Sequence, residues 1–173
     1  YLKSKLYLFE KLLKKNSNVI TDSEILEYKK IKKISLRKKL NISTISNYKS
    51  NLSLISHQYL EGKQISEVRY KNKIYKFQTS LVGKIQIKNI LMAMLAAEKS
   101  GLNFKQIINV IDKVKPVNGR LEKIGTIKND SLVLLDYAHT PDALQTCLQN
   151  LKEQFKNKKI SIVFGCGGNR DQS

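Results

Sequence analysis

The sequence is short of cysteine, arginine and acidic residues, and it has no long apolar run. Its two cysteines, Cys147 and Cys166, lie far apart and form no CxxC pair. This usage gives no sign of a disulfide framework and fits a reducing compartment, so we expect a cytoplasmic protein. No apolar run approaches the length of a membrane-spanning helix, so we expect no membrane partner.

The charge is strongly one-sided, because 32 basic residues face 14 acidic ones and the formal net charge is +18. Such a balance first suggests nucleic acid. Only four of the basic residues are arginine, however, whereas proteins that read bases and phosphates favour the bidentate arginine fork. The basic run 29–39 also contains no aromatic residue. We interpret the lysines as solvating helix faces and expect no nucleic-acid partner, with a lysine-rich nucleic-acid-binding module as the alternative.

The spacing of apolar residues predicts an α/β chain. Its first part is predicted to hold helices at residues 2–15, 22–34, 86–100 and 104–114, a strand at 18–21, and alternating strands within 41–78. The turn Lys71-Asn72-Lys73 is predicted to join two of these strands as an antiparallel hairpin. Pro116 and Gly119 predict a domain boundary that divides the chain into residues 1–116 and 117–173.

Beyond this boundary the pattern is strand, helix, strand. Residues 132–135 and 160–164 are continuous apolar strands, and residues 141–155 are a helix with Thr140 as N-cap and Pro141 at its first position. Continuous apolar strands around a helix indicate a parallel sheet that is covered on both faces.

Asp136 and His139 follow the first of these strands. In open parallel α/β sheets ligands bind at the carboxyl ends of strands, where a carboxylate accepts from ribose hydroxyls and an imidazole bonds phosphate or base. The alternative is that Asp136 and Asp142 only stabilise the start of the helix.

Two arginines are further candidates. Arg170 follows three glycines within residues 165–168, which let a ligand approach the backbone, and its planar fork suits a carboxylate. Arg120 lies at the predicted domain boundary, where it could reach a phosphate or pair locally with Glu122. Neither short motif is specific by itself.

Together these segments closely resemble the Mur ligases. The resemblance is carried by residues 118–122 (NGRLE), 136–144 (DYAHTPDAL) and 163–171 (VFGCGGNRD). It implies the end of a central, mostly parallel-sheet ATPase domain with a small antiparallel portion, followed by the start of a Rossmann-like C-terminal domain. By the same resemblance Arg120 contacts ATP phosphate, Asp136 and His139 line the ATP site, and Arg170 binds the carboxylate of the incoming amino acid.

The resemblance extends to the first part of the chain. Residues 83–89 are similar to the family's G-x-x-N-x-x-N segment, which implies that Asn89 contacts adenine, although Gln86 replaces the first asparagine. Residues 1–5 resemble the family's Y-x-x-x-K, which implies that Lys5 carries a carbamate that binds Mg²⁺. Lys5 could equally be one more lysine on a lysine-rich helix. Thr21-Asp22-Ser23-Glu24 departs from the family's Asn-x-Asp-Asp, a departure that we expect to affect only a turn.

The implied cofactors are ATP and Mg²⁺, and the implied reaction adds the third amino acid of the peptidoglycan stem peptide. Its substrates would be UDP-N-acetylmuramoyl-L-alanyl-D-glutamate and meso-diaminopimelate or L-lysine, and we expect a monomer. The chain lacks an initiator methionine and the family's upstream P-loop and downstream Asp-Asn-Pro-Arg segment, so we expect a fragment that is inactive alone. Another ligase of the superfamily, such as cyanophycin synthetase, and a non-catalytic paralogue remain as alternatives.

Overall fold

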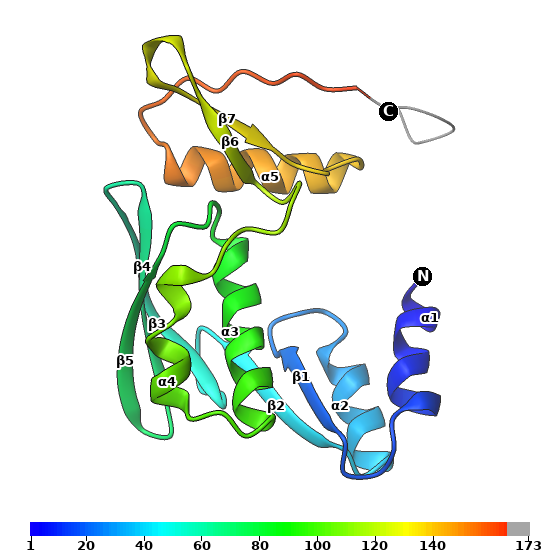
Figure 1. Ribbon diagram of the computed structural model, residues 1–173. Helices are drawn as coiled ribbons and strands as arrows, with labels where there is room; N and C mark the ends of the chain where they lie inside the picture. The colour runs from blue at the N-terminus through cyan, green and yellow to red at the C-terminus, as the bar shows by residue number, and fades with distance from the viewer. Residues whose placement is uncertain (166–173) are drawn as a thin grey trace. The chain divides into compact units, whose positions relative to one another are not determined.

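The computed structural model describes residues 1–165 and divides the chain into two compact units (Figure 1). The first unit consists of Tyr1–His57, Ser66–Phe77 and Lys88–Ile111. The second consists of Gln58–Ile65, Gln78–Ile87 and the described residues from Asp112 onward. Arg170 and Cys166, singled out above, lie outside the described residues. No helix in the described part of the chain is long and apolar enough to cross a membrane.

A mixed five-stranded sheet has its strands in sequence order. β1 pairs in parallel with β2, and β2 pairs in parallel with β3. β3, β4 and β5 follow one another through two-residue turns, which only antiparallel neighbours can use. The strands are β1 (Asn18–Asp22), β2 (Asn41–Ser46), β3 (Leu52–Leu60), β4 (Lys63–Tyr70) and β5 (Lys73–Thr79). The predicted combination of parallel and antiparallel strands is therefore confirmed, but the sheet is mixed and only partly parallel, because two of its four strand pairings are antiparallel.

The two hairpin turns explain themselves from the backbone. Glu61 and Gly62 have φ of 50° and 75°, and Lys71 and Asn72 have φ of 46° and 62°. Two successive positive φ values match the right-handed twist of the flanking strands, and glycine and asparagine tolerate them best. The predicted turn at residues 71–73 is confirmed, except that Lys73 already begins β5.

The first helix is shorter than predicted. α1 (Leu2–Tyr7) continues as a single π-helical turn, η1 (Leu8–Leu12), and Leu13 is extended with ψ of 134°. The predicted apolar face is nevertheless the one that packs. Leu6, Phe9 and Leu13 lie against a cluster of buried side chains on β1, α2 and the start of β2, namely Val19, Ile31 and Leu40. Burial of one face thus survives the change of helix type.

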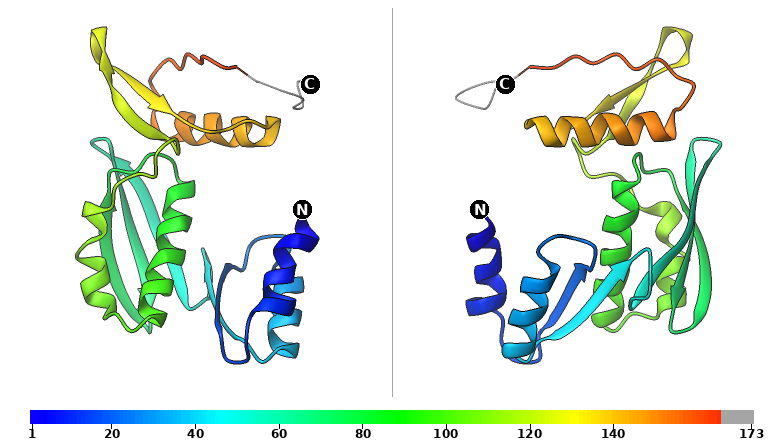
Figure 2. Two further views of the ribbon diagram at one scale, coloured as in Figure 1. Left: turned by 45° about the vertical axis from the view of Figure 1, so that its right-hand side comes forward. Right: turned by 180° about the vertical axis from the view of Figure 1, so that it is seen from behind.

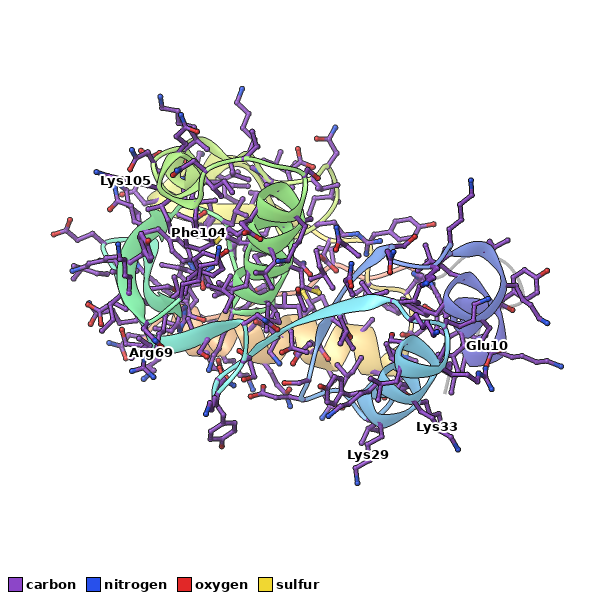
Figure 3. The ribbon with its side chains drawn as sticks, turned by 90° about the horizontal axis from the view of Figure 1, so that it is seen from below. Glu10, Lys29, Lys33, Arg69, Phe104 and Lys105 are labelled. Carbon is purple, nitrogen blue, oxygen red and sulfur yellow. The ribbon has the colours of Figure 1, made fainter. Side chains whose placement is uncertain are left out.

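The second helix begins later than predicted. It was predicted to begin at residue 22, but Asp22 ends β1, and α2 runs from Tyr28 to Arg37. The Asp22 carboxylate accepts from the backbone N–H of Glu24 at 2.8 Å, which closes a turn instead of a helix. Lys29 and Lys33 point outward from α2 (Figure 3), as expected for solvating lysines.

Two helices follow β5. α3 (Ile85–Lys99) matches the predicted helix at 86–100, and the chain leaves it at Gly101, whose φ is +98°. The next predicted helix, 104–114, is split into α4 (Phe104–Ile108) and a 3₁₀ turn at Ile111–Lys113, called η2. Phe104 and Ile107 on α4 and Ile111 in η2 are buried, and Phe104 points inward while Lys105 points out (Figure 3).

The second unit contains an antiparallel ribbon where a parallel sheet was predicted. β7 (Ser131–Leu135) matches the predicted strand, but its partner is β6 (Glu122–Ile127), joined to it by the 3₁₀ turn η3 (Lys128–Asp130). So short a connection allows only antiparallel pairing. Residues 160–164, predicted as the second parallel strand, have no regular secondary structure because they form no ladder with β7. α5 (Pro141–Gln154) confirms the predicted helix, and two further views are given in Figure 2.

Candidate functional site

The loop after β7 brings three predicted site residues together within the second unit. Asp136 directly follows β7, and its Oδ2 accepts from the backbone N–H of Leu121 at 2.8 Å, while its Oδ1 accepts from that of Ala138 at 2.9 Å. One carboxylate therefore fastens the turn that carries Arg120 to the loop that carries His139. The N-cap of α5 is Thr140, whose hydroxyl accepts from Ala143, so Asp136 does more than stabilise the helix start.

The Tyr137 ring contacts the side chains of Arg120 and His139. The guanidinium carbon of Arg120 lies 5.6 Å from the centre of the Tyr137 ring, and the His139 ring lies edge-on to that ring at 5.2 Å. A cation above an aromatic face is attracted by its negative quadrupole. The backbone N–H of Tyr137 also donates to the carbonyl of Gly119 at 2.9 Å, so the two turns are held together by main-chain contacts as well.

The His139 ring has a defined orientation. Its Nδ1 lies 3.0 Å from the carbonyl oxygen of Tyr137. A carbonyl can only accept, so this bond places the proton on Nδ1 and leaves Nε2 of the neutral ring as an acceptor. Glu122 accepts from the N–H of Gly119 at 2.7 Å. Arg120 and His139 are both exposed, and can therefore meet a ligand from solvent.

A second group of polar side chains lies in the first unit, at the carboxyl ends of the parallel strands β1 and β2. The Lys88 Nζ lies 2.6 Å from Asp22 Oδ2 and 3.2 Å from Glu24 Oε2. The other side of the Glu24 carboxylate accepts from the backbone N–H of Asn47 at 2.8 Å. The departure at residues 21–24, expected to affect only a turn, thus also provides two carboxylates for a lysine on α3.

The carboxylates of Asp22 and Glu24 stabilise the charged form of Lys88. Burial by itself would lower the pKa of Lys88, but its hydrogen bonds and charge interactions with Asp22 and Glu24 outweigh burial and raise that pKa. The Asp22 side chain is only 7% exposed, so its ion pair with Lys88 is the more buried of the two. Sequence reasoning did not identify Lys88, because nothing in the sequence pairs residues that are 66 positions apart.

Asn89 follows Lys88 on α3 and is exposed. Lys5 is exposed on α1, where its Nζ lies 5.3 Å from the centre of the Tyr1 ring. Lys5 and Asn89 belong to the first unit, and Arg120, Asp136 and His139 to the second. No group of three or more His, Cys, Asp or Glu side chains that could hold a metal ion occurs within residues 1–165.

The start of α3 is held by amide side chains within the second unit. The backbone N–H of Gly83 donates to Gln154 Oε1 at 2.7 Å, and that of Ile85 donates to Asn150 Oδ1 at 3.1 Å. Gln86, which replaces the family asparagine, places its Nε2 3.4 Å from the carbonyl oxygen of Arg120. The longer amide therefore reaches the turn that carries the candidate phosphate-binding arginine.

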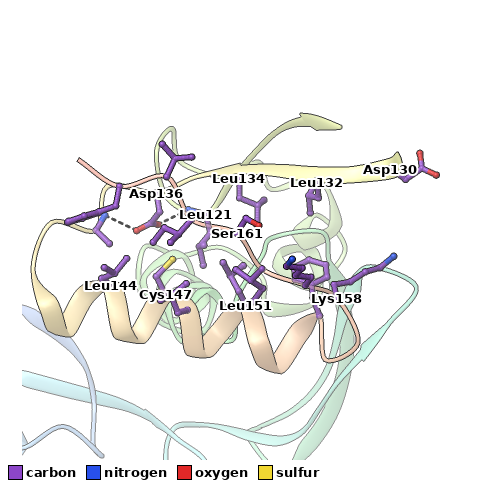
Figure 4. A pocket seen from close by; sticks show the side chains of 18 residues that line it. Leu121, Asp130, Leu132, Leu134, Asp136, Leu144, Cys147, Leu151, Lys158 and Ser161 are labelled. Atoms are coloured by element: carbon purple, nitrogen blue, oxygen red, sulfur yellow. Dashed lines mark hydrogen bonds between the residues drawn. The ribbon is translucent and has the colours of Figure 1, made fainter. Parts of the chain in front are cut away.

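A cavity of about 390 Å³ lies between α5, β7 and residues 158–164 (Figure 4). Its walls are mostly apolar, with Asp136 at one end, Asp130 and Lys158 at the other, and Ser161 between them. Burial and the nearby Asp136 charge raise the pKa of the Cys147 thiol on its wall. The walls suit hydrocarbon, so we place no polar substrate there.

Comparison with known proteins connects both groups to one family. Residues 1–97 match the Mur ligase middle domain, and residues 119–173 match the Mur ligase glutamate ligase domain. The UDP-N-acetylmuramoyl-L-alanyl-D-glutamate--2,6-diaminopimelate ligase of Rickettsia bellii (strain RML369-C) is 37% identical over 99% of this chain. That of Chelativorans sp. (strain BNC1) is 30% identical over 99% of this chain. In both comparisons the chain spans 35% of the relative's length.

Solved structures agree with this assignment. A structure of UDP-N-acetylmuramoyl-L-alanyl-D-glutamate--2,6-diaminopimelate ligase superposes with a TM-score of 0.71 at 25% identity, covering 99% of this chain and 35% of that one. The MurF ligase from Thermotoga maritima, in complex with ADP, gives a TM-score of 0.72 at 19% identity, covering 88% of this chain and 34% of that one. The second likeness concerns the fold alone.

Proposed function

The chain belongs to the Mur ligase family, and on that premise we propose that the protein containing it adds the third amino acid to UDP-N-acetylmuramoyl-L-alanyl-D-glutamate in peptidoglycan synthesis. The relatives at 30–37% identity carry that activity in their names, which supports this branch of the family. The observation that carries the proposal is the convergence of Arg120, Asp136 and His139 on one pair of turns. We further propose residues 1–116 and 117–173 as parts of two domains.

The proposed reaction proceeds in two balanced steps. The γ-phosphoryl group of ATP passes to a carboxylate oxygen of the D-glutamyl residue, which gives an acyl phosphate and ADP. The amine of the incoming amino acid then attacks the acyl carbon, the carbon–oxygen bond to phosphate breaks, and the amine loses a proton. Such catalysis depends on positioning and on neutralisation of negative charge.

The second unit would supply part of the ATP site. Arg120 would neutralise phosphate charge, and its guanidinium carbon, 5.6 Å from the centre of the Tyr137 ring, is attracted to that ring by a cation–π interaction. The Asp136 carboxylate would line the site while it holds the backbone of Leu121. His139, with its proton on Nδ1, would present Nε2 as an acceptor to the nucleotide. Asn89 would contribute the adenine contact.

Lys5 would hold Mg²⁺ through a carbamate, which supplies two anionic oxygens. Oxygen donors of this kind suit Mg²⁺, which completes its coordination with water and nucleotide phosphates and neutralises their charge. Lys5 is exposed, as are its neighbours Lys3 and Lys11, so the assignment rests on the resemblance of residues 1–5 to the family's Y-x-x-x-K.

Arg170 would bind the carboxylate of the incoming amino acid, because its guanidinium fork matches a carboxylate. Meso-diaminopimelate is the proposed amino acid, with L-lysine as the second candidate. We propose that the enzyme acts as a monomer in the cytoplasm and has neither nucleic acid nor a membrane as a partner.

Phosphate release by the full-length gene product tests the proposal. We expect release that requires ATP, Mg²⁺, UDP-N-acetylmuramoyl-L-alanyl-D-glutamate and one diamino acid together. Turnover with an unrelated acceptor would instead favour another ligase of the superfamily, such as cyanophycin synthetase. Steeply salt-dependent binding of DNA or RNA without turnover would favour a nucleic-acid-binding module.

The amino-acid site has its own test. We expect Arg170→Ala in the full-length protein to raise the KM for the amino acid far more than the KM for ATP. An unchanged amino-acid KM would remove Arg170 from the site.

A further inference from the structure

Lys88 connects three separate segments of the first unit. It lies on α3, one residue before Asn89, and its ammonium contacts the carboxylates of Asp22 and Glu24. Asp22 is the last residue of β1, and Glu24 in turn accepts two hydrogen bonds from Asn47, at 2.8 and 3.0 Å, just after β2. The start of α3 is thereby fastened to the carboxyl ends of two parallel strands.

The contacts are graded by burial. The side chain of Asp22 is 7% exposed, that of Glu24 is 24% exposed, and that of Lys88 is 34% exposed. The shorter ion pair, at 2.6 Å, is the one to the buried carboxylate. Removal of the Lys88 ammonium would leave the buried Asp22 carboxylate without this ion pair, so we expect the neighbouring backbone to shift.

Lys88 directly precedes Asn89 on α3, so its ion pairs also affect the orientation of Asn89. Successive residues on an α-helix are about 100° apart, so fixing the side chain of Lys88 also fixes the direction in which Asn89 leaves the helix. The carboxyl edge of parallel strands is where α/β sheets bind ligands. Asn89 is exposed beside that edge.

We propose that Lys88, through Asp22 and Glu24, is a positioning residue for the nucleotide, which it serves by setting the direction of Asn89. The role rests on the proposed function, because the adenine contact of Asn89 does. Lys88 itself touches no nucleotide in this proposal. Lys88, Asp22 and Glu24 take no part in the chemical steps of this proposal and act only by orienting α3.

The test compares two ion-paired lysines: Lys88, which lies near the start of α3, and Lys71, whose partner Glu98 lies near the end of α3. Lys71 lies 3.4 Å from Glu98 and provides the matched control. In the full-length gene product we expect Lys88→Met to raise the KM for ATP about tenfold while kcat changes less than about threefold. Selectivity for ATP over GTP should fall, because the amide that faces the base is misdirected. Lys71→Met should change neither the KM for ATP nor the selectivity for ATP over GTP. Lys88→Arg should return the KM for ATP most of the way to the parent value.

Two further measurements keep the outcomes distinct. If Lys88→Met fails to fold in a thermal melt, Glu24→Gln replaces it, and a smaller rise of the ATP KM in the same direction is expected. Equal behaviour of Lys88→Met, or of Glu24→Gln in its place, and Lys71→Met overturns the positioning role but leaves the proposed function standing. Failure of the wild-type protein to bind ATP in equilibrium titration overturns both.

Discussion

The carboxylate of Asp136 accepts a hydrogen bond from the backbone N–H of Leu121, at 2.8 Å and across 15 residues of sequence. The residue before Leu121 is Arg120, and Asp136 itself leads into the loop with His139. This bond and the one from the Tyr137 N–H to the Gly119 carbonyl join the two segments that contain the candidate nucleotide ligands. The other carboxylate oxygen of Asp136 accepts a hydrogen bond from the backbone N–H of Ala138, so both oxygens are engaged.

We expect Asp136→Ala to lower the free energy of unfolding of the second unit by about 1–3 kcal/mol, because two part-buried N–H groups lose their acceptor. Asp136→Asn keeps one oxygen acceptor and should lose less. Chemical denaturation measures both. Asp142→Ala, at an exposed position in the first turn of α5, is the control and should cost less than about 1 kcal/mol. Equal losses at the two aspartates would contradict the bridging role.

Gly83 should not tolerate a side chain. Its φ is +89°, and an added Cβ would meet Leu121 Cδ1 at 2.7 Å. We expect Gly83→Ala to cost about 1–2 kcal/mol for the left-handed backbone and a further 1–3 kcal/mol for the overlap. Gly101, with φ of +98° and no atom within 4 Å of an added Cβ, separates the two causes. In thermal melts Gly101→Ala should show only the backbone cost. An equal fall of the melting temperature in Gly83→Ala and Gly101→Ala would contradict an added cost from the Leu121 contact.

Arg120 should matter for chemistry more than for stability. We expect Arg120→Ala to reduce kcat about 10²-fold, because a preorganised charge for the phosphate is lost. Arg120→Lys keeps the charge but loses the fork and most of the stacking on Tyr137, so it should restore activity only in part. Lys123, exposed on β6, is the control, since Lys123→Ala should leave kcat unchanged. Steady-state phosphate release measures all three, and full activity of Arg120→Ala would refute the role.

The Cys147 thiol should react slowly at neutral pH. Burial, and secondly the Asp136 charge, raise the pKa of this thiol, so less of the reactive thiolate is present. In a Cys166→Ser background we expect modification by an aromatic disulfide to be slow near neutrality and to accelerate at alkaline pH. Asp136→Asn should shift that acceleration to lower pH.

The sign of the linked stability follows from the same shift. Because the pKa of the folded thiol lies above its unfolded value, the stabilisation is complete below the unfolded pKa and is lost as the pH rises through the folded pKa. As the pH rises into the alkaline range, the melting temperature of the parent should therefore fall more than that of the Cys147→Ser variant. A thiol that reacts at neutral pH as fast as a free cysteine would contradict the assignment.

Much of the secondary structure could be predicted because it depends on local patterns. Pro141 and Thr140 mark the start of α5, and Lys71-Asn72 mark a hairpin turn, since each residue has its effect within a few positions of itself. The start of α2 and the end of α4 could not be predicted. Asp22 has the right chemistry for an N-cap, but its carboxylate is engaged by the Glu24 N–H and by Lys88.

Three short motifs in one order were enough to indicate the family, and the same motifs predict that Arg120, Asp136 and His139 share a ligand. Only the tertiary structure decided how they are joined and which residues support them. The Asp136–Leu121 bond, the stacking of Arg120 on Tyr137, and the pairing of Lys88 with Asp22 all connect residues more than a dozen positions apart. Such contacts depend on where chain segments meet in space, which periodicity and local propensity do not encode.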